Sequence, residues 1–147
     1  MTPFKQLFID GAMAPAHGAD DLPVTDSFTE ETFASYRSAS LADVDAAVAA
    51  ARRAFADWGA TPPMGRVTPG RPIAAAPRAQ AEALTTAISR EVGMPRKLAA
   101  RIQVGAPIAA WDMYADLAAA FEWESRIGHS LVQQVAIGVV ACITPWN

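Results

Sequence analysis

The chain has 147 residues, of which 52% are hydrophobic and 18% charged, and its formal net charge is −3. This length is typical of one domain. The apolar fraction excludes a disordered chain, because disorder combines low hydrophobicity with high net charge. The 12 basic side chains do not outnumber the 15 acidic ones, so we expect no nucleic-acid partner. The single cysteine, Cys142, excludes an internal disulfide and a cysteine-cluster zinc site.

No segment of the sequence indicates export or membrane insertion. Residues Met1–Asp10 lack the basic and apolar regions of a signal peptide. The longest apolar run, Val135–Ile143, is too short to cross a bilayer as a helix. We therefore expect a soluble cytoplasmic protein with no membrane partner.

The first third of the chain predicts strands and turns. Phe8 and Ile9 are followed by Asp10-Gly11, a dipeptide that closes β-hairpins. Residues Asp26–Glu31 predict a turn between two further strands, because Thr32–Arg37 is rich in β-branched and aromatic residues.

A helix is predicted from about Leu41 to Asp57. Ser40 and Asp43 have the spacing of a capping box, which satisfies free N–H groups at a helix start. The large apolar residues recur every three or four positions and form one stripe: Leu41, Val44, Val48, Ala51, Phe55 and Trp58. Gly59, together with Pro62-Pro63, is expected to stop the helix.

Prolines interrupt the next helical region. A helix could be capped by Thr68 and tolerate Pro72 in its first turn, but Pro77 is not expected inside it. We therefore predict that the next helix starts at Pro77 and ends near Val92-Gly93.

Two further prolines bear on the helix that follows. Pro95 fits the first position of that helix, and Pro107 should kink or break it. The chain is expected to leave the helix at Phe121, turn at residues 128–130 and form an exposed strand over Leu131–Gln134.

Residues Ile137–Ile143 are continuously apolar, which is typical of a strand buried on both faces of a parallel sheet. Such a strand needs neighbours that this sequence does not supply, so the chain is expected to be part of a larger fold. Ligand-binding loops follow strands of this kind, and the Asn147 side chain could donate a hydrogen bond there. From spacing alone, an ordinary turn is the more common interpretation.

The segment Ile143-Thr144-Pro145-Trp146-Asn147, after Gly138-Val139-Val140, resembles the signature of the aldehyde dehydrogenase superfamily. The resemblance extends over nearly the whole chain, because its parts lie at matching spacings: the opening strand, the helix at Ala42–Trp58, Arg66, Glu91–Pro95 and Phe121–Gly128. The departures are Pro69, Pro72 and Pro77, which lie where the family has one continuous helix, and Glu30, Ala136 and His129 at other motif positions.

The resemblance implies an α/β fold, of which this chain would be the incomplete N-terminal portion. Residues 1–120 would belong to the dinucleotide-binding domain and residues 121–136 would start the oligomerisation arm. Residues 137–147 would supply the first buried strand of the sheet and a cofactor-site loop. The intact relative is expected to be a homo-oligomer.

The resemblance also implies a reaction, the NAD- or NADP-dependent oxidation of an aldehyde to a carboxylic acid. In the family a cysteine thiolate attacks the aldehyde, hydride passes to the nicotinamide and water hydrolyses the thioester. Asn147 matches the catalytic asparagine whose amide stabilises the oxyanion. Four residues match the segment that lines the cofactor site, namely Ile143, Thr144, Pro145 and Trp146.

The family's nucleophilic cysteine and general-base glutamate would lie beyond position 147. Cys142 is expected to be a buried, inert thiol within the apolar strand. His17 and His129 lack a third ligand at metal spacing, so no metal site is expected. We therefore expect the 147-residue chain alone to be inactive. The alternatives are a non-catalytic remnant that binds full-length subunits and, less favoured, an unrelated helical binding domain.

Overall fold

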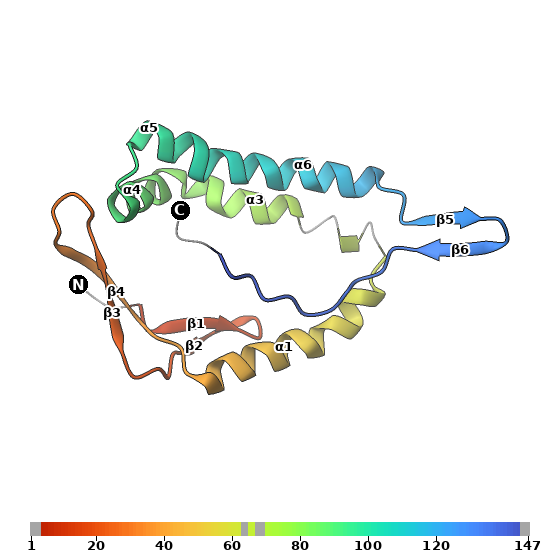
Figure 1. Ribbon diagram of the computed structural model, residues 1–147, viewed down its shortest axis with the longest axis horizontal. Coiled ribbons are helices and arrows are strands. Elements are labelled where there is room, and N and C mark those ends of the chain that lie inside the picture. The colour runs from red at the N-terminus through yellow and green to blue at the C-terminus, as the bar shows by residue number, and fades with distance from the viewer. Residues whose placement is uncertain (1–3, 63–64, 67–69, 145–147) are drawn as a thin grey trace. The chain divides into compact units, whose positions relative to one another are not determined.

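The computed structural model describes residues 4–62, 65–66 and 70–144, which form both helices and strands (Figure 1). The chain divides into two compact units. One unit contains the residues up to Ala56, the short segment Arg90–Gly93 and the residues from Val139 onward. The other unit contains Asp57–Ser89 and Met94–Gly138.

The first hairpin of the first unit confirms the turn predicted at Asp10-Gly11. Strand β1 (Gln6–Ile9) pairs antiparallel with β2 (Ala12–Pro15), with Ile9 opposite Ala12. Asp10 and Gly11 both have positive φ, 55° and 78°. This pair of left-handed residues matches the right-handed twist of two-residue hairpins.

The second hairpin confirms the turn predicted at Asp26–Glu31. Strand β3 (Asp21–Thr25) pairs antiparallel with β4 (Thr32–Arg37), and the register shifts between Val24 and Thr25. The Asp26 carboxylate accepts hydrogen bonds from the backbone N–H groups of Phe28 (3.0 Å) and Thr29 (3.3 Å). This side chain therefore holds the turn in the way that aspartates at turn starts do.

Helix α1 (Leu41–Ala60) begins at the predicted capping box. The Asp43 N–H donates to Ser40 Oγ at 3.2 Å, and the Ser40 N–H donates to Asp43 Oδ2 at 2.8 Å. The helix extends slightly further than predicted, because Gly59 lies inside its last turn. A single glycine weakens a helix without necessarily ending it.

Helices α3 (Gly70–Ala79) and α4 (Ala81–Val92) correct the prediction for the proline-rich region. Pro77 lies inside α3, and the break comes at Gln80, whose N–H donates to the Pro77 carbonyl at 3.2 Å. Because Pro77 is in the last turn of a short helix, its missing N–H removes one helical hydrogen bond near an end that is already closing. Pro72 lies in the first turn of α3, as the sequence allowed, whereas Thr68 and Pro69 lie outside the described residues.

The next helix differs from the prediction at both prolines. Pro95 is the N-cap of α5 (Arg96–Leu98) rather than its first residue. A π-helical stretch, η1 (Ala99–Gly105), then leads into α6 (Ala106–Ala120) without a break at Pro107. The Ala106 N–H reaches back five residues to the Arg101 carbonyl. We attribute the continuity to this wider turn, which gives room to a ring that would clash in a regular α-helix.

Helices α3 and α6 lie side by side within the second unit (Figure 1). Arg78 Nη2 on α3 donates to Asp112 Oδ2 on α6 at 2.6 Å. The buried apolar side chains of this unit are mostly small: Ala74, Ala99, Val104, Ile108 and Ala115. Three of these five buried side chains are alanines, so each contributes little apolar area to the core.

A third hairpin follows α6 in the same unit. Strand β5 (Glu124–Ile127) pairs antiparallel with β6 (Ser130–Gln133) around Gly128, which has a φ of 59°. The backbone N–H of Gln134 donates to the Trp123 carbonyl at 2.9 Å and closes the base of the hairpin. The predicted turn and the predicted strand that follows it are therefore confirmed, with the strand one residue earlier.

Candidate functional site

The predicted site lies on the segment that follows β6, and the structure corrects the prediction of a buried strand there. Residues 134–144 belong to none of the three described two-stranded sheets. The side chains of Ile137 and Ile143 are 91% and 94% exposed. An apolar run forms a buried strand only where neighbouring strands and helices cover it, and no described element pairs with this one.

Two of the five predicted site residues fall within the described chain. Ile143 and Thr144 are exposed, and the other three, Pro145, Trp146 and Asn147, lie outside the described residues. Cys142 is also exposed. The prediction of a buried thiol is therefore wrong for this structure, for the same reason as the buried strand.

A cluster of polar groups surrounds the Asp43 carboxylate at the start of α1. Besides the Ser40 N–H and Oγ, this carboxylate meets the backbone N–H of His17 at 2.9 Å and His17 Nδ1 at 2.7 Å. Asp43 is buried, and the hydrogen bonds from His17 and Ser40 hold its pKa well below the ordinary value. The capping motif predicted the Ser40 contact, but nothing in the sequence indicated the partner 26 residues away.

A second cluster joins the β3–β4 turn to the end of α4. Arg90 Nε donates to Asp26 Oδ2 at 2.6 Å, and the Arg90 guanidinium lies 4.2 Å from the centre of the Phe33 ring. The hydrogen bond from Arg90 lowers the pKa of Asp26. Ser27 N–H and Oγ both donate to the Arg90 carbonyl, at 2.8 and 2.9 Å. These contacts fix local structure and leave little polar capacity for a ligand.

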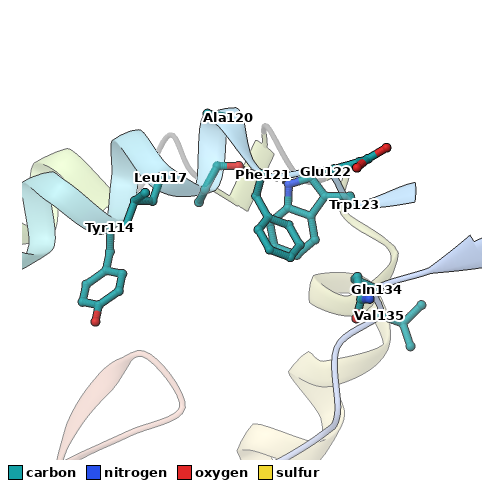
Figure 2. Close-up of a pocket in the computed structure, with 9 residues that line it drawn as sticks. Tyr114, Leu117, Ala120, Phe121, Glu122, Trp123, Gln134 and Val135 are labelled. Atoms are coloured by element: carbon teal, nitrogen blue, oxygen red, sulfur yellow. Dashed lines mark hydrogen bonds between the residues drawn. The ribbon is translucent and has the colours of Figure 1, made fainter. Parts of the chain in front are cut away.

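A cavity of about 780 Å³ lies between the end of α6 and the chain after β6. Figure 2 shows Tyr114 and Leu117 on α6, the Phe121 and Trp123 rings beyond its end, and Gln134 and Val135 on the other side. The Phe121 and Trp123 rings meet edge to face, with centres 4.8 Å apart. Nothing in the sequence indicates this cavity, because its lining residues come together only through the β5–β6 hairpin.

Neither a metal site nor a membrane span is found in the described part of the chain. Over residues 4–62, 65–66 and 70–144, no three side chains of His, Cys, Asp or Glu gather as they would around a metal ion. Across the same ranges, no helix is long and apolar enough to cross a membrane.

Comparison with known proteins identifies the family. The model of the aldehyde dehydrogenase family matches residues 14–147. The chain is 29% identical over its full length to a 3-succinoylsemialdehyde-pyridine dehydrogenase from a Pseudomonas species. It is 36% identical, over 97% of its length, to the N-succinylglutamate 5-semialdehyde dehydrogenase of Burkholderia multivorans. The chain spans about 30% of the length of these relatives.

Solved structures agree with the sequence comparison. Aldehyde dehydrogenase C (AldC) of Pseudomonas syringae, solved as a mutant with NAD+ and octanal, matches 90% of this chain with a TM-score of 0.82 and 33% identity. The chain covers 27% of that enzyme. A Mycobacterium tuberculosis aldehyde dehydrogenase complexed with NAD+ matches 87% of the chain with a TM-score of 0.77 and 29% identity. The chain therefore belongs to the aldehyde dehydrogenase family, and its helices and hairpins are part of that family's α/β fold.

Proposed function

We propose that this chain serves as the N-terminal part of an NAD(P)-dependent aldehyde dehydrogenase that oxidises an aldehyde to a carboxylic acid. The observation that carries the proposal is the continuous family match over residues 14–147, which includes the Ile143–Asn147 motif. The cofactors seen with the solved relatives support a nicotinamide dinucleotide. That group, when bound, supplies the hydride acceptor of the oxidation.

The chain's own contribution would be to hold the cofactor and to stabilise negative charge. Ile143 and Thr144 are exposed on a segment outside the described sheets. This is consistent with a site that contacts a dinucleotide through backbone groups. The amide of Asn147 would donate a hydrogen bond to the substrate oxygen as negative charge develops on it, an effect that usually contributes a large part of the rate enhancement.

We further propose that the 147-residue chain alone does not oxidise aldehydes. Its only thiol is Cys142, which lies in the apolar segment Ile137–Ile143, next to the motif residues. Among the described residues, no histidine or cationic side chain hydrogen-bonds to this exposed thiol, as it would to activate a cysteine nucleophile. A covalent step on the aldehyde therefore has no activated sulfur to begin it.

The test is a steady-state assay of the purified chain with NAD+ or NADP+ and a panel of aldehydes, in which formation of reduced cofactor is measured. The expected result is a rate equal to that of buffer. A rate above buffer that the Cys142→Ser variant abolishes would overturn the proposal of inactivity.

A second candidate function is a non-catalytic module that binds full-length subunits of the same family. The observation that favours it is the apolar stripe of α1. Its side chains remain open to solvent, with Leu41 85% exposed, Val44 51% and Val48 43%. Contiguous exposed apolar surface of this kind commonly marks an interface.

Co-purification with a full-length relative tests this second function. A tagged chain should retain the relative through washing, and a Val44→Asp, Val48→Asp variant should lose it. An Asp45→Asn variant serves as a control, because its side chain is polar and exposed on the same helix. Equal retention by the stripe variant would contradict the interface.

A further inference from the structure

A buried cationic N–H group near Trp123 lacks a hydrogen-bond acceptor. Arg66 Nε is buried, and no hydrogen-bond partner reaches it among the described residues. The Arg66 guanidinium lies 5.3 Å from the centre of the Trp123 ring. A buried donor without an acceptor destabilises a structure, and more so when it is charged. The Arg66 guanidinium is therefore a donor that an acceptor on another molecule would stabilise.

The two cavities beside this group have different chemistry. The one that Arg66 lines has a volume of about 390 Å³ and a mixed polar lining that includes Glu124 and Gln133. The second is the 780 Å³ cavity, whose walls are mostly aromatic and aliphatic. Trp123, Gln134 and Val135 line both cavities, so the two volumes adjoin along these residues.

Several polar groups around the shared wall are paired with one another, and Arg66 is the cationic donor that lines the smaller cavity. The Trp123 indole N–H donates to the Ala118 carbonyl at 3.1 Å, and its own carbonyl accepts from the Gln134 N–H at 2.9 Å. Gln133 Nε2 donates to Glu124 Oε1 at 2.6 Å. These bonds hold Trp123 between an apolar space and a cation.

We propose that these adjoining cavities bind a monocarboxylate with an apolar chain or ring. The carboxylate would accept a charge-assisted hydrogen bond from Arg66, and the apolar part would lie against Trp123 and Phe121 in the larger cavity. Carboxylates match the guanidinium geometry, whereas the aromatic walls favour burial of a hydrocarbon. Glu122 and Glu124 line the same cavities and repel an anion, so they limit its affinity.

The test uses the purified 147-residue chain and octanoate as the probe, with affinity measured by NMR titration. Acetate controls for the apolar chain, and octylammonium controls for the charge. The Arg66→Gln variant should bind octanoate about tenfold more weakly, or worse, because it loses a hydrogen bond between charged groups. Arg101→Gln is the matched control, since Arg101 is an exposed arginine of the same unit that lines neither cavity.

A gain of affinity provides a test that does not depend on a damaged variant. Glu124→Gln should bind octanoate more tightly, because it removes the negative charge that lines the same cavity as Arg66 while keeping the side-chain shape. Failure of the wild-type chain to bind octanoate, equal binding of acetate or octylammonium, or unchanged binding by Arg66→Gln would each overturn the proposal. The readout is binding, so these outcomes do not depend on whether the chain takes part in aldehyde oxidation.

Discussion

Replacing Gly18, which lies between β2 and β3, by alanine is expected to destabilise the first unit more than replacing Gly11. Gly18 is buried, and its N–H donates to the Ser38 carbonyl at 3.0 Å. A Cβ atom at this position would overlap the backbone carbonyl and the hydroxyl of Ser38. Because the obstacle includes backbone, the two segments must separate.

The expected cost of this substitution follows from two terms. Separation of the segments breaks the Gly18–Ser38 hydrogen bond, which is worth about 0.5–1.5 kcal/mol. The displaced backbone adds an overpacking cost of about 1–3 kcal/mol. Gly18→Ala should therefore lower the free energy of unfolding by about 1.5–4.5 kcal/mol. The neighbouring bond from the His17 N–H to Asp43 is expected to weaken as well.

Urea unfolding followed by far-UV circular dichroism measures this loss, with the free energy obtained by linear extrapolation. Gly11→Ala is the control. Its Cβ would meet nothing within 4 Å, but its φ of 78° is left-handed, which costs a non-glycine residue about 1–2 kcal/mol. A Gly18→Ala variant within 0.5 kcal/mol of the wild type, or more stable than Gly11→Ala, would refute the steric argument.

Three further predictions concern the rest of the chain. Asp43→Asn should be less stable than the wild type at pH 7. Folding lowers the Asp43 pKa, so the ionised carboxylate stabilises the fold fully above the ordinary aspartate pKa of about 3.9. The free-energy advantage of the wild type over Asp43→Asn should shrink as the pH falls below that value. Urea unfolding at several pH values measures this advantage, and a constant advantage down to low pH would contradict the prediction. Pro77→Ala should raise the free energy of unfolding by up to about 3 kcal/mol, because Pro77 lies inside α3; a lower melting temperature would contradict this. Ile108→Ala should cost about 2–5 kcal/mol at a site only 8% exposed, whereas Ile137→Ala, at a site 91% exposed, should cost less than about 0.5 kcal/mol; similar losses for the two variants would contradict the burial pattern.

Local sequence signals predicted the local structure well. The Asp10-Gly11 hairpin and the Ser40–Asp43 capping box involve residues within a few positions of each other, and both appear as the sequence indicates. Such motifs depend on backbone geometry and short-range hydrogen bonds, which the residue types themselves determine.

Features that depend on distant residues could not be predicted in the same way. Whether Pro107 breaks a helix depends on the wider π-helical turn before it, and whether Ile137–Ile143 is buried depends on which elements cover it. The His17–Asp43 contact and the cavity beside Trp123 likewise join residues far apart in sequence. The candidate site was found through its motif, not through periodicity.

We propose that this chain supplies a working N-terminal part of an aldehyde dehydrogenase, in which the Asn147 amide donates to the oxyanion. The most direct measurement replaces the corresponding part of Pseudomonas syringae AldC with residues 1–147 of this chain and assays octanal oxidation with NAD+. We expect the chimera to be active. In the chimera, Asn147→Ala should lower kcat by about 100- to 1,000-fold, the usual cost of removing an oxyanion donor. A folded chimera without activity, or one whose kcat is unchanged by Asn147→Ala, would contradict it.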